Sequence, residues 1–183
     1  MSDRHQHRAD WHAYNEGVFF VTVCCAEKRH YFGEIRDGKM FTSSIGDIVE
    51  RHIRSITQHF PDVEILNHVV MPNHVHFIIA IGCHPGGGPQ LIAATNTGCL
   101  KPRQHDPREV QNFHHNNRLS VIMRCLKGGI KREAGRLGIE FSWQSRFYDH
   151  IIRNRRSFEN IMNYVDSNVE NWETDRFSQP ITR

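Results

Sequence analysis

The stretch Met71-Pro-Asn-His-Val-His-Phe-Ile-Ile-Ala80 limits the fold of this chain more than any other segment. An apolar run entered through a Pro-Asn turn predicts a buried β-strand, whose side chains point alternately to its two faces. The residues that would face a core on one side are Val75, Phe77, Ile79 and Ile81. His74 and His76 would then lie side by side on the opposite face.

Two imidazoles side by side on a rigid strand supply two ligands for a divalent metal ion. The same pattern also fits histidines that face solvent or that only form hydrogen bonds, and the chain has 14 histidines. Several of these lie in polar segments, where contact with water explains them. The metal interpretation of His74 and His76 therefore depends on further chemistry elsewhere in the chain.

The remaining patterns predict an α+β fold. β-branched and aromatic residues predict a central strand at residues 17–25, and Asp37-Gly38 is a strong signal for a hairpin turn. Residues 63–70 precede the Met71-Pro-Asn73 turn, so they should pair antiparallel with the histidine strand. Extended segments are predicted at residues 17–25, 31–35, 39–42, 63–70, 139–143 and 146–153.

Apolar residues at helical spacing predict three amphipathic helices. These helices span residues 43–60, 119–137 and 157–172. Ser43-Ser44 opens the first, with Asp47 as a capping-box-like partner. In the second, Gly128-Gly129 predicts a kink, because each glycine costs a helix about 1 kcal/mol relative to alanine. Ser157 is the predicted cap of the third.

Length and composition favour a single domain over residues 1–183 with an excursion at residues 82–118. The excursion is rich in glycine, proline and polar residues, which predicts a flexible loop or a small subelement. Residues 1–16 predict a polar arm. The five cysteines form no C-x-x-C pair and are odd in number, so neither a zinc-thiolate site nor a disulfide framework is indicated.

No apolar run approaches the roughly 20 residues of a membrane span, and the N-terminus lacks an apolar signal segment. The expected compartment is therefore the cytoplasm, without membrane association. A net charge of +3 does not by itself indicate nucleic-acid binding. The helix at 119–137, however, carries a basic face that fits phosphate contacts, although a solvated helix surface explains it equally well.

The third helix carries a second group of reactive side chains. Tyr164 falls at the edge of its apolar stripe, with Asn168 one turn further on the same side. A tyrosine can attack phosphorus and form a covalent phosphotyrosine link, and a metal held by His74 and His76 can activate the phosphate. The Asn168 amide oxygen can complete the ligand set. The other candidate nucleophiles are Tyr14, Tyr31 and Tyr148.

Motifs in several parts of the chain carry a resemblance to a known family. The stretch Met71 to Ile79 resembles the His-hydrophobic-His strand of the single-tyrosine HUH transposases. The segments 143–154 and 157–168, with Trp172, resemble the REP-associated tyrosine transposases. Phe20-Val-Thr-Val23 and His30 to Met40 are similar to the same group. The likeness covers nearly all of the chain except residues 82–118 and the tails.

The resemblance implies an antiparallel sheet flanked by helices, of ferredoxin-like or RNA-recognition-like type. His74 and His76 match the metal-binding histidines, Tyr164 the nucleophile, and Asn168 the polar residue that contributes to the metal site. The implied activity is cleavage and rejoining of single-stranded DNA at hairpin-flanked sites, through a 5′-phosphotyrosine and with Mg²⁺ or Mn²⁺. Many relatives have Asn-Pro where this chain has Asn168-Val169, and valine permits a longer helix.

The implied partner is hairpin-containing single-stranded DNA, whose bases stack on exposed aromatic rings. The candidate DNA contacts are Arg124, Lys127, Lys131, Arg132, Tyr148 and Arg153. A homodimer that supplies the tyrosine in trans is an open arrangement. Two other functions also fit the sequence: an inactive descendant that binds hairpins without cutting them, and an unrelated H-x-H phosphoester hydrolase in which Tyr164 is incidental.

Overall fold

The structure is a computed structural model that describes residues 16–82, 117–175 and 178. The predicted arm, apart from Glu16, and residues 83–116 of the predicted excursion lie outside the described residues. In chain order the elements are β1 (Gly17–Cys24), η1 (Ala26–Lys28), β2 (Gly33–Arg36), β3 (Lys39–Thr42), α1 (Ser44–Arg54), α2 (Ile56–His59), β4 (Val63–Met71), β5 (His74–Ile81), α4 (Arg118–Arg136), β6 (Tyr148–Ile152), α5 (Arg155–Asp166) and η3 (Trp172–Thr174).

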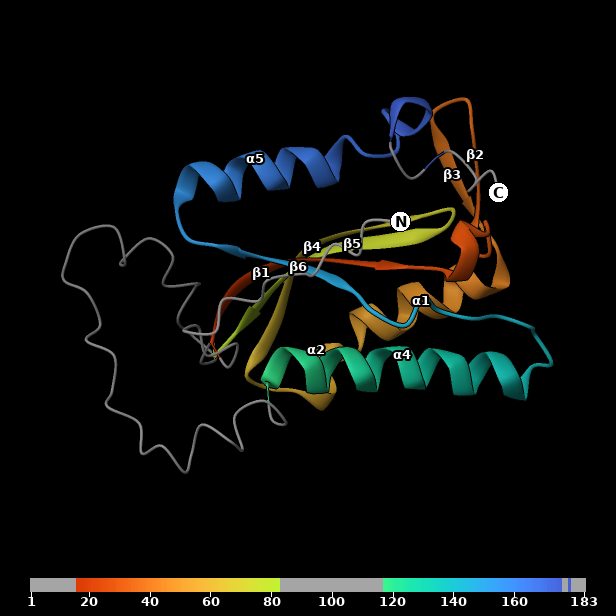
Figure 1. The fold of residues 1–183 in the computed structure, drawn as a ribbon, viewed down its shortest axis with the longest axis horizontal. Helices are drawn as coiled ribbons and strands as arrows, with labels where there is room; N and C mark the ends of the chain where they lie inside the picture. The colour runs from red at the N-terminus through yellow and green to blue at the C-terminus, as the bar shows by residue number, and fades with distance from the viewer. Residues whose placement is uncertain (1–15, 83–116, 176–177, 179–183) are drawn as a thin grey trace, which may run out of the picture.

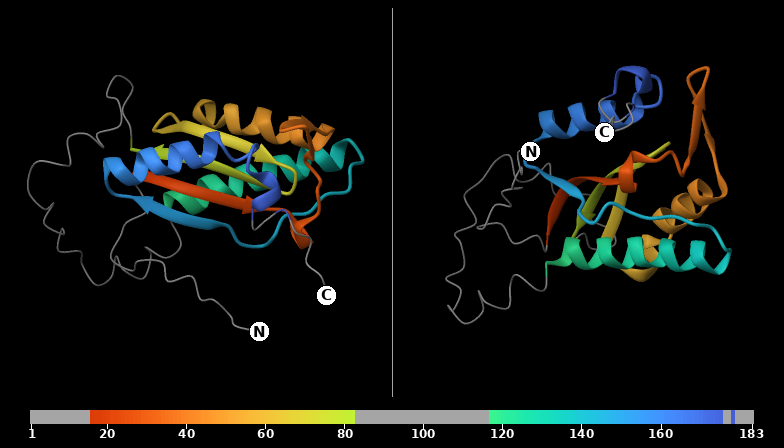
Figure 2. Two further views of the ribbon diagram at one scale, coloured as in Figure 1. Left: turned by 90° about the horizontal axis from the view of Figure 1, so that it is seen from above. Right: turned by 45° about the vertical axis from the view of Figure 1, so that its right-hand side comes forward.

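A four-stranded antiparallel sheet in the order β4-β5-β1-β6 forms the centre of the molecule (Figure 1). α1 lies between β1 and β4 in the chain, and α4 lies between β5 and β6. This βαββαβ order with an antiparallel sheet is the ferredoxin-like arrangement. The predicted fold class is therefore confirmed. β2 and β3 form a separate hairpin that stands at one end of the sheet (Figure 2).

Helices cover both faces of the sheet. α1, α2 and α4 lie on one face, called here the α1/α4 face, and α5 lies on the other, called the α5 face (Figures 1 and 2). β5 is buried along its whole length. As predicted, its residues Val75, Phe77, Ile79 and Ile81 belong to the large core cluster on the α1/α4 face. Ile78 and Ala80 point to the opposite face, where they pack with Val165 of α5.

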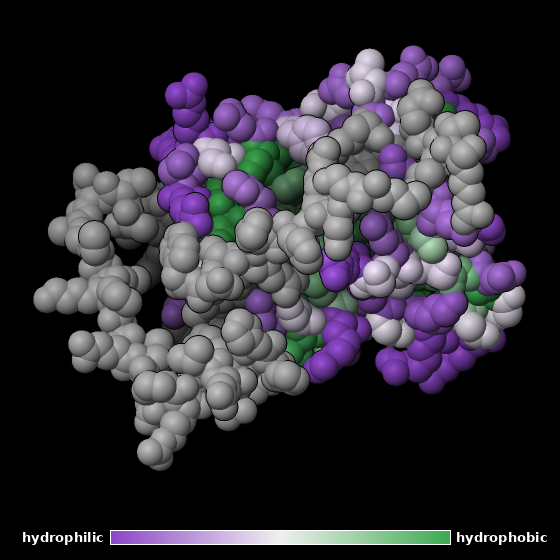
Figure 3. Space-filling model, in the orientation of Figure 1, coloured by the Kyte–Doolittle hydropathy of each residue, from purple (hydrophilic) through white to green (hydrophobic). Residues whose placement is uncertain are grey.

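The α5 face has the thinner apolar layer. Only five residues of its cluster are buried among the described residues, and the rest of the cluster is partly exposed. The partly buried members are Phe20, Leu66, Val69, Phe158, Ile161 and Met162. Figure 3 shows apolar surface (green) at the upper left, where α5 meets the sheet, and mostly polar surface around β2 and β3. This side of the sheet is thus the more accessible one.

The predicted hairpin is present, and its turn has the expected chemistry. Asp37 and Gly38 both have positive φ, at 50° and 68°, which is the backbone of a type I′ turn. β2 begins at Gly33 rather than at the predicted residue 31.

The first predicted helix is shorter than expected. α1 ends at Arg54, and α2 follows after Ser55. Ser43 is the N-cap, and its Oγ accepts a hydrogen bond from the Gly46 amide at 3.2 Å. The predicted capping partner Asp47 instead accepts a hydrogen bond from the Thr42 hydroxyl at 2.6 Å, so that prediction was wrong.

The predicted kink in the second helix is also wrong, because α4 runs unbroken from Arg118 to Arg136. Packing against α1 explains why a glycine stands at position 129. A Cβ atom there would lie 2.9 Å from Cε1 of His52, closer than carbon atoms normally approach. The glycine therefore allows the two helices to pack closely. Within residues 16–82 and 117–175, none of the helices has the length and apolarity needed to cross a membrane.

The last helix differs from the prediction at both ends. Asn154, not Ser157, is the N-cap, and its side chain accepts a hydrogen bond from the Ser157 amide at 2.8 Å. α5 ends at Asp166 and not near Trp172, so Val169 does not lengthen it. The Ser167 hydroxyl donates to the carbonyl of Asn163 at 2.8 Å, and such side-chain bonds compete with helical backbone bonds. The chain then turns back towards the sheet.

Candidate functional site

His74 and His76 lie next to each other on the α5 face, as the alternation along β5 predicted. Their ring centroids are 4.5 Å apart, and the two Nε2 atoms face each other at 3.0 Å. The sheet fixes both residues, because His74 pairs with Cys24 and Met71 and His76 pairs with Thr22 and Val69. Both side chains are buried, with exposures of 0% and 1%.

Polar partners surround the two rings despite this burial. Nδ1 of His74 lies 2.8 Å from Oδ1 of Asn73, and Nδ1 of His76 lies 2.8 Å from Oγ1 of Thr22. Phe20 stacks on His76, with centroids 5.1 Å apart, and Trp172 lies over His74 at 6.1 Å. The imidazoles are thus held in a defined polar arrangement beneath an aromatic cover, not packed among apolar side chains alone.

Tyr164 reaches this pair from the flank of α5. Its hydroxyl lies 3.3 Å from Nε2 of His76, and the residue keeps 40% of its surface exposed. The same hydroxyl donates a hydrogen bond to Oδ2 of Asp175 at 3.4 Å. The structure therefore brings together a strand histidine and a helix tyrosine that are 88 residues apart in the chain.

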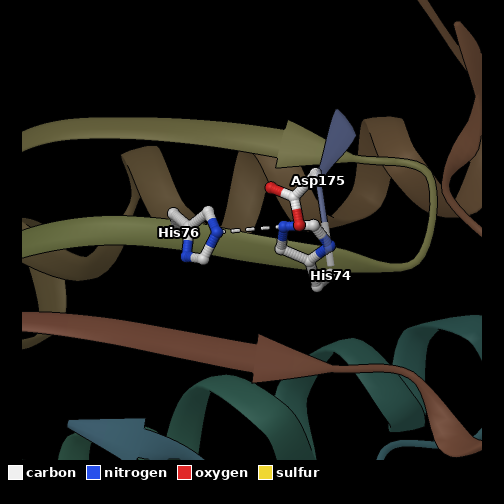
Figure 4. Close-up of side chains that lie close together, drawn as sticks. All are labelled: His74, His76 and Asp175. Carbon is white, nitrogen blue, oxygen red and sulfur yellow. Dashed lines mark hydrogen bonds between the residues drawn. The ribbon is translucent and has the colours of Figure 1, made fainter. Parts of the chain in front are cut away.

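Asp175 belongs to the site although no sequence pattern indicated it. One ligand atom each from His74, His76 and Asp175 lie within 4.8 Å of one another, and the carboxylate approaches both imidazoles (Figure 4). Asp175 follows η3 in a segment that looked like a polar tail. In the sequence, only the carboxylate side chain of Asp175 indicates a possible metal ligand, because the position of this residue depends on the chain reversal after α5.

Asn168 lies in the turn after α5, so it is not on the helix as predicted. It is 2% exposed, and among the described residues its Oδ1 atom has no hydrogen-bond partner. A buried oxygen without a partner is costly unless a ligand satisfies it. Two imidazole nitrogens and a carboxylate are donors that a divalent cation such as Mg²⁺ or Mn²⁺ accepts, so His74, His76 and Asp175 fit such an ion.

Of the predicted DNA contacts on β6 and just after it, only Tyr148 lies near the histidines. Tyr148 pairs directly with Thr22 across β6 and β1, so its side chain is on the α5 face, where it is 47% exposed. Arg153 is exposed and directly follows β6. An aromatic ring therefore lies on the edge strand in the same row of the sheet as His76, whereas Arg153 lies beyond the other end of that strand.

The other four predicted contacts are on α4, which lies on the opposite face of the sheet from α5 (Figure 1), whereas the histidines lie on the α5 face. Arg124 and Arg132 are exposed there. Lys127 donates to the carbonyls of Gln144 and Ser145 at 2.7 and 3.1 Å, and Lys131 donates to the carbonyl of Phe141. Burial lowers the pKa of Lys127 from its usual value. The structure does not bring these four residues to the candidate site, and both lysines hold the segment that follows α4.

The fold of the chain is similar to that of a solved transposase. The structure of a REP-associated tyrosine transposase bound to a REP hairpin superposes with a TM-score of 0.50 and 18% identity, over 92% of this chain and 72% of that one. The protein thus has a transposase-type fold.

No protein-family model matches the chain. An uncharacterized protein of Haemophilus influenzae is 31% identical over 163 residues, which are 88% of this chain and 85% of that protein. The chain belongs to the same family as this Haemophilus protein.

Proposed function

We propose that the protein is a metal-dependent DNA transposase that cleaves and rejoins single-stranded DNA through a covalent 5′-phosphotyrosine on Tyr164. The observation that carries the proposal is the 3.3 Å approach of the Tyr164 hydroxyl to His76, beside a second histidine. A half-exposed phenol next to a cluster of metal-ligand atoms suits attack on a phosphate that arrives from solvent. The transposase-type fold supports the same function.

The reaction would run by direct displacement at phosphorus. Oη of Tyr164 bonds to the scissile phosphorus and loses its proton, while the bond from phosphorus to the 3′ oxygen breaks and that oxygen takes up a proton. The products are a 5′-phosphotyrosine and a free 3′ hydroxyl. Attack by another 3′ hydroxyl reverses the step, so strand transfer needs no nucleotide cofactor. The hydrogen bond to Asp175 orients the phenol for this attack.

His74, His76 and Asp175 would hold the cation, with Asn168 as a further oxygen ligand. A bound Mg²⁺ or Mn²⁺ polarises the scissile phosphate and stabilises the departing oxygen. Because Tyr164 and the histidines meet within one chain, the proposal assigns the tyrosine to its own subunit's site.

The proposed substrate is a single strand next to a hairpin, because the scissile phosphate has to enter a site on the sheet. Tyr148 would stack on an unpaired base, and Arg153, at the other end of β6, would contact a phosphate further along the strand of DNA. Arg124 and Arg132 remain predicted phosphate contacts for a part of the DNA that extends to the α1/α4 face. Lys127 and Lys131 would have to exchange their carbonyl partners for phosphate.

A test of the proposal uses a hairpin-bearing single-stranded oligonucleotide, labelled on the 3′ side of the expected cut, with Mn²⁺ or Mg²⁺. The wild-type protein should give a covalent adduct that survives denaturing electrophoresis, and Tyr164→Phe should give none. Tyr31→Phe is the matched control, because the Tyr31 ring packs against Phe141 on the other side of the sheet. This control should form the adduct at the wild-type level.

Other outcomes would separate the alternatives. Binding of the hairpin by the wild-type protein without any adduct would indicate an inactive binding protein. Phosphoester turnover that continues in Tyr164→Phe would indicate a hydrolase in which the tyrosine has no role. An adduct that persists in Tyr164→Phe and is lost in Tyr148→Phe would assign the nucleophile to the edge strand. Restored activity on mixing Tyr164→Phe with His76→Ala protein would show action in trans.

A further inference from the structure

The Nδ1 atoms of both histidines, which point away from the shared Nε2 contact, each have a side-chain oxygen at 2.8 Å. The two oxygens differ in chemistry. Asn73 provides an amide oxygen, and its orientation is fixed because its Nδ2 atom donates to the carbonyl of Lys28 at 3.2 Å. Thr22 provides a hydroxyl from the neighbouring strand and is itself 2% exposed. The two contacts therefore constrain the ring protons of the two histidines differently.

Asn73 permits one arrangement only. An amide oxygen accepts hydrogen bonds and cannot donate them, so Nδ1 of His74 has to carry the proton. The Nε2 atom of neutral His74 then carries a lone pair, not a proton, and it faces His76. A hydroxyl can both donate and accept, so Thr22 is compatible with a proton on either nitrogen of His76.

The 3.0 Å contact between the two Nε2 atoms requires a proton or a cation between them, because two lone pairs that face each other at this distance repel. In the metal-free protein with neutral rings, His76 has to supply a proton from Nε2, because the proton of His74 is on Nδ1. The Thr22 hydroxyl then donates to Nδ1 of His76. When both Nε2 atoms bind a cation, the proton of His76 has to lie on Nδ1, where Thr22 can accept it.

We propose that Thr22 and Asn73 are positioning residues for the metal site, with Asn73 holding His74 in one tautomer and Thr22 allowing His76 to change tautomer when the cation binds. This inference rests on the metal site of the proposed function and does not depend on the nuclease reaction. Residues that hold the outer nitrogen of a metal-binding histidine commonly change metal affinity about 10- to 100-fold when they are replaced.

The first test measures Mn²⁺ affinity without DNA, from the electron paramagnetic resonance signal of free Mn²⁺. Thr22→Val keeps the β-branched shape that suits β1 but removes the hydroxyl, and it should weaken binding about 10- to 100-fold. Thr22→Ser keeps the hydroxyl and should restore affinity to near the wild-type value. Equal affinity in all three proteins would overturn the role of Thr22, whereas a loss in Thr22→Val with recovery in Thr22→Ser would support it.

The second test needs no variant, so it does not depend on how well a variant folds. ¹⁵N NMR of the imidazole rings distinguishes the two tautomers, and Mg²⁺ serves as the diamagnetic ion. His74 should carry its proton on Nδ1 with and without Mg²⁺, and His76 should change from Nε2–H to Nδ1–H as Mg²⁺ is added. A proton on Nε2 of metal-free His74, or an unchanged His76, would overturn the inference.

The experiments distinguish a failure of the tautomer inference from a failure of the proposed nuclease function. A wild-type protein that shows the tautomer change and binds Mn²⁺, yet forms no DNA adduct, would contradict the nuclease proposal and support this inference. A wild-type protein that forms the adduct with Mn²⁺ while His76 keeps one tautomer throughout would support the nuclease proposal and contradict this inference.

Discussion

Tyr164, His76 and Asp175 meet because three separate backbone features place them together. β5 presents the histidine on the α5 face, α5 presents the phenol from its flank, and the chain reversal after Asp166 returns the carboxylate. The phenol hydroxyl lies 3.3 and 3.4 Å from its two partners. Replacing any one of the three side chains should therefore affect metal binding and the placement of the Tyr164 hydroxyl to different extents.

Asp175→Asn should weaken Mn²⁺ binding by at least about tenfold, because a neutral amide replaces a charged ligand oxygen. Asp166→Asn is the matched control, since Asp166 is the last residue of α5 and its carboxylate accepts a hydrogen bond from Asn67 at 2.7 Å. Calorimetric titration with Mn²⁺ would measure both. Equal affinity of the two variants would show that Asp175 is not a ligand.

Asn168→Leu should separate stability from metal binding. The variant removes a buried oxygen that lacks a partner among the described residues, so the metal-free protein should gain about 1 kcal/mol, or about 2–4 °C in Tm. The rise in Tm that Mn²⁺ causes should be smaller in Asn168→Leu than in the wild-type protein. Asn168→Asp should show a rise of wild-type size. A less stable Asn168→Leu protein with an undiminished Mn²⁺ effect would show that Asn168 has a structural role.

At the scale of elements, α1 and α4 form one layer, and their close spacing depends on the lack of a side chain at Gly129. Gly129 lies against the ring of His52, which is held by a 2.7 Å hydrogen bond to Glu133 of α4. The neighbouring Gly128 has no atom within 4 Å of the position that a Cβ would occupy. Two adjacent glycines in one helix therefore have different reasons to be there.

Gly128→Ala should stabilise the protein by about 0.5–1 kcal/mol, because alanine has the higher helix propensity and meets open space. Gly129→Ala should gain nothing or destabilise the protein, because its methyl group meets the His52 ring. Urea unfolding of both variants would measure the difference. An equal gain in the two variants would mean that the His52 ring moves aside without cost.

At the scale of the whole molecule, ionic contacts connect the layers on the α1/α4 face. Glu50 of α1 accepts a hydrogen bond from His68 of β4 at 2.9 Å, and this contact holds the pKa of Glu50 below its usual value. Arg118, at the start of α4, contacts Asp62 at 3.0 Å and holds the pKa of that carboxyl below its usual value. Both carboxylates are therefore better stabilised in the folded state than in the unfolded chain.

The sign of the pH dependence follows from these lowered pKa values. The stabilisation is complete above the unfolded values near pH 4 to 4.5 and is lost as the pH falls through the lower folded values. The free energy of unfolding of the wild-type protein should decrease below about pH 4.5. Glu50→Gln and His68→Gln should each reduce this decrease. An acid decrease of wild-type size in both variants would show that the pair contributes nothing to it.

Sequence patterns were most successful where a local rule decides the structure. Alternation along residues 74–81 predicted which side chains of β5 face the large core, and Asp37-Gly38 predicted the type of turn. Both features depend on neighbouring residues only. The helix ends were less predictable, because Asn154 and Ser157 are both good caps and Ser167 competes with the backbone through its hydroxyl.

The sequence by itself determined the antiparallel α+β fold, the shared face of His74 and His76, and a tyrosine at the edge of the last helix, because residue spacing controls direction within one element. Only the tertiary structure decided that Asp175 returns to the histidines, that Thr22 and Asn73 hold their outer nitrogens, and that the basic residues of α4 lie across the sheet. These placements arise from contacts between elements distant in the chain, which no local periodicity encodes.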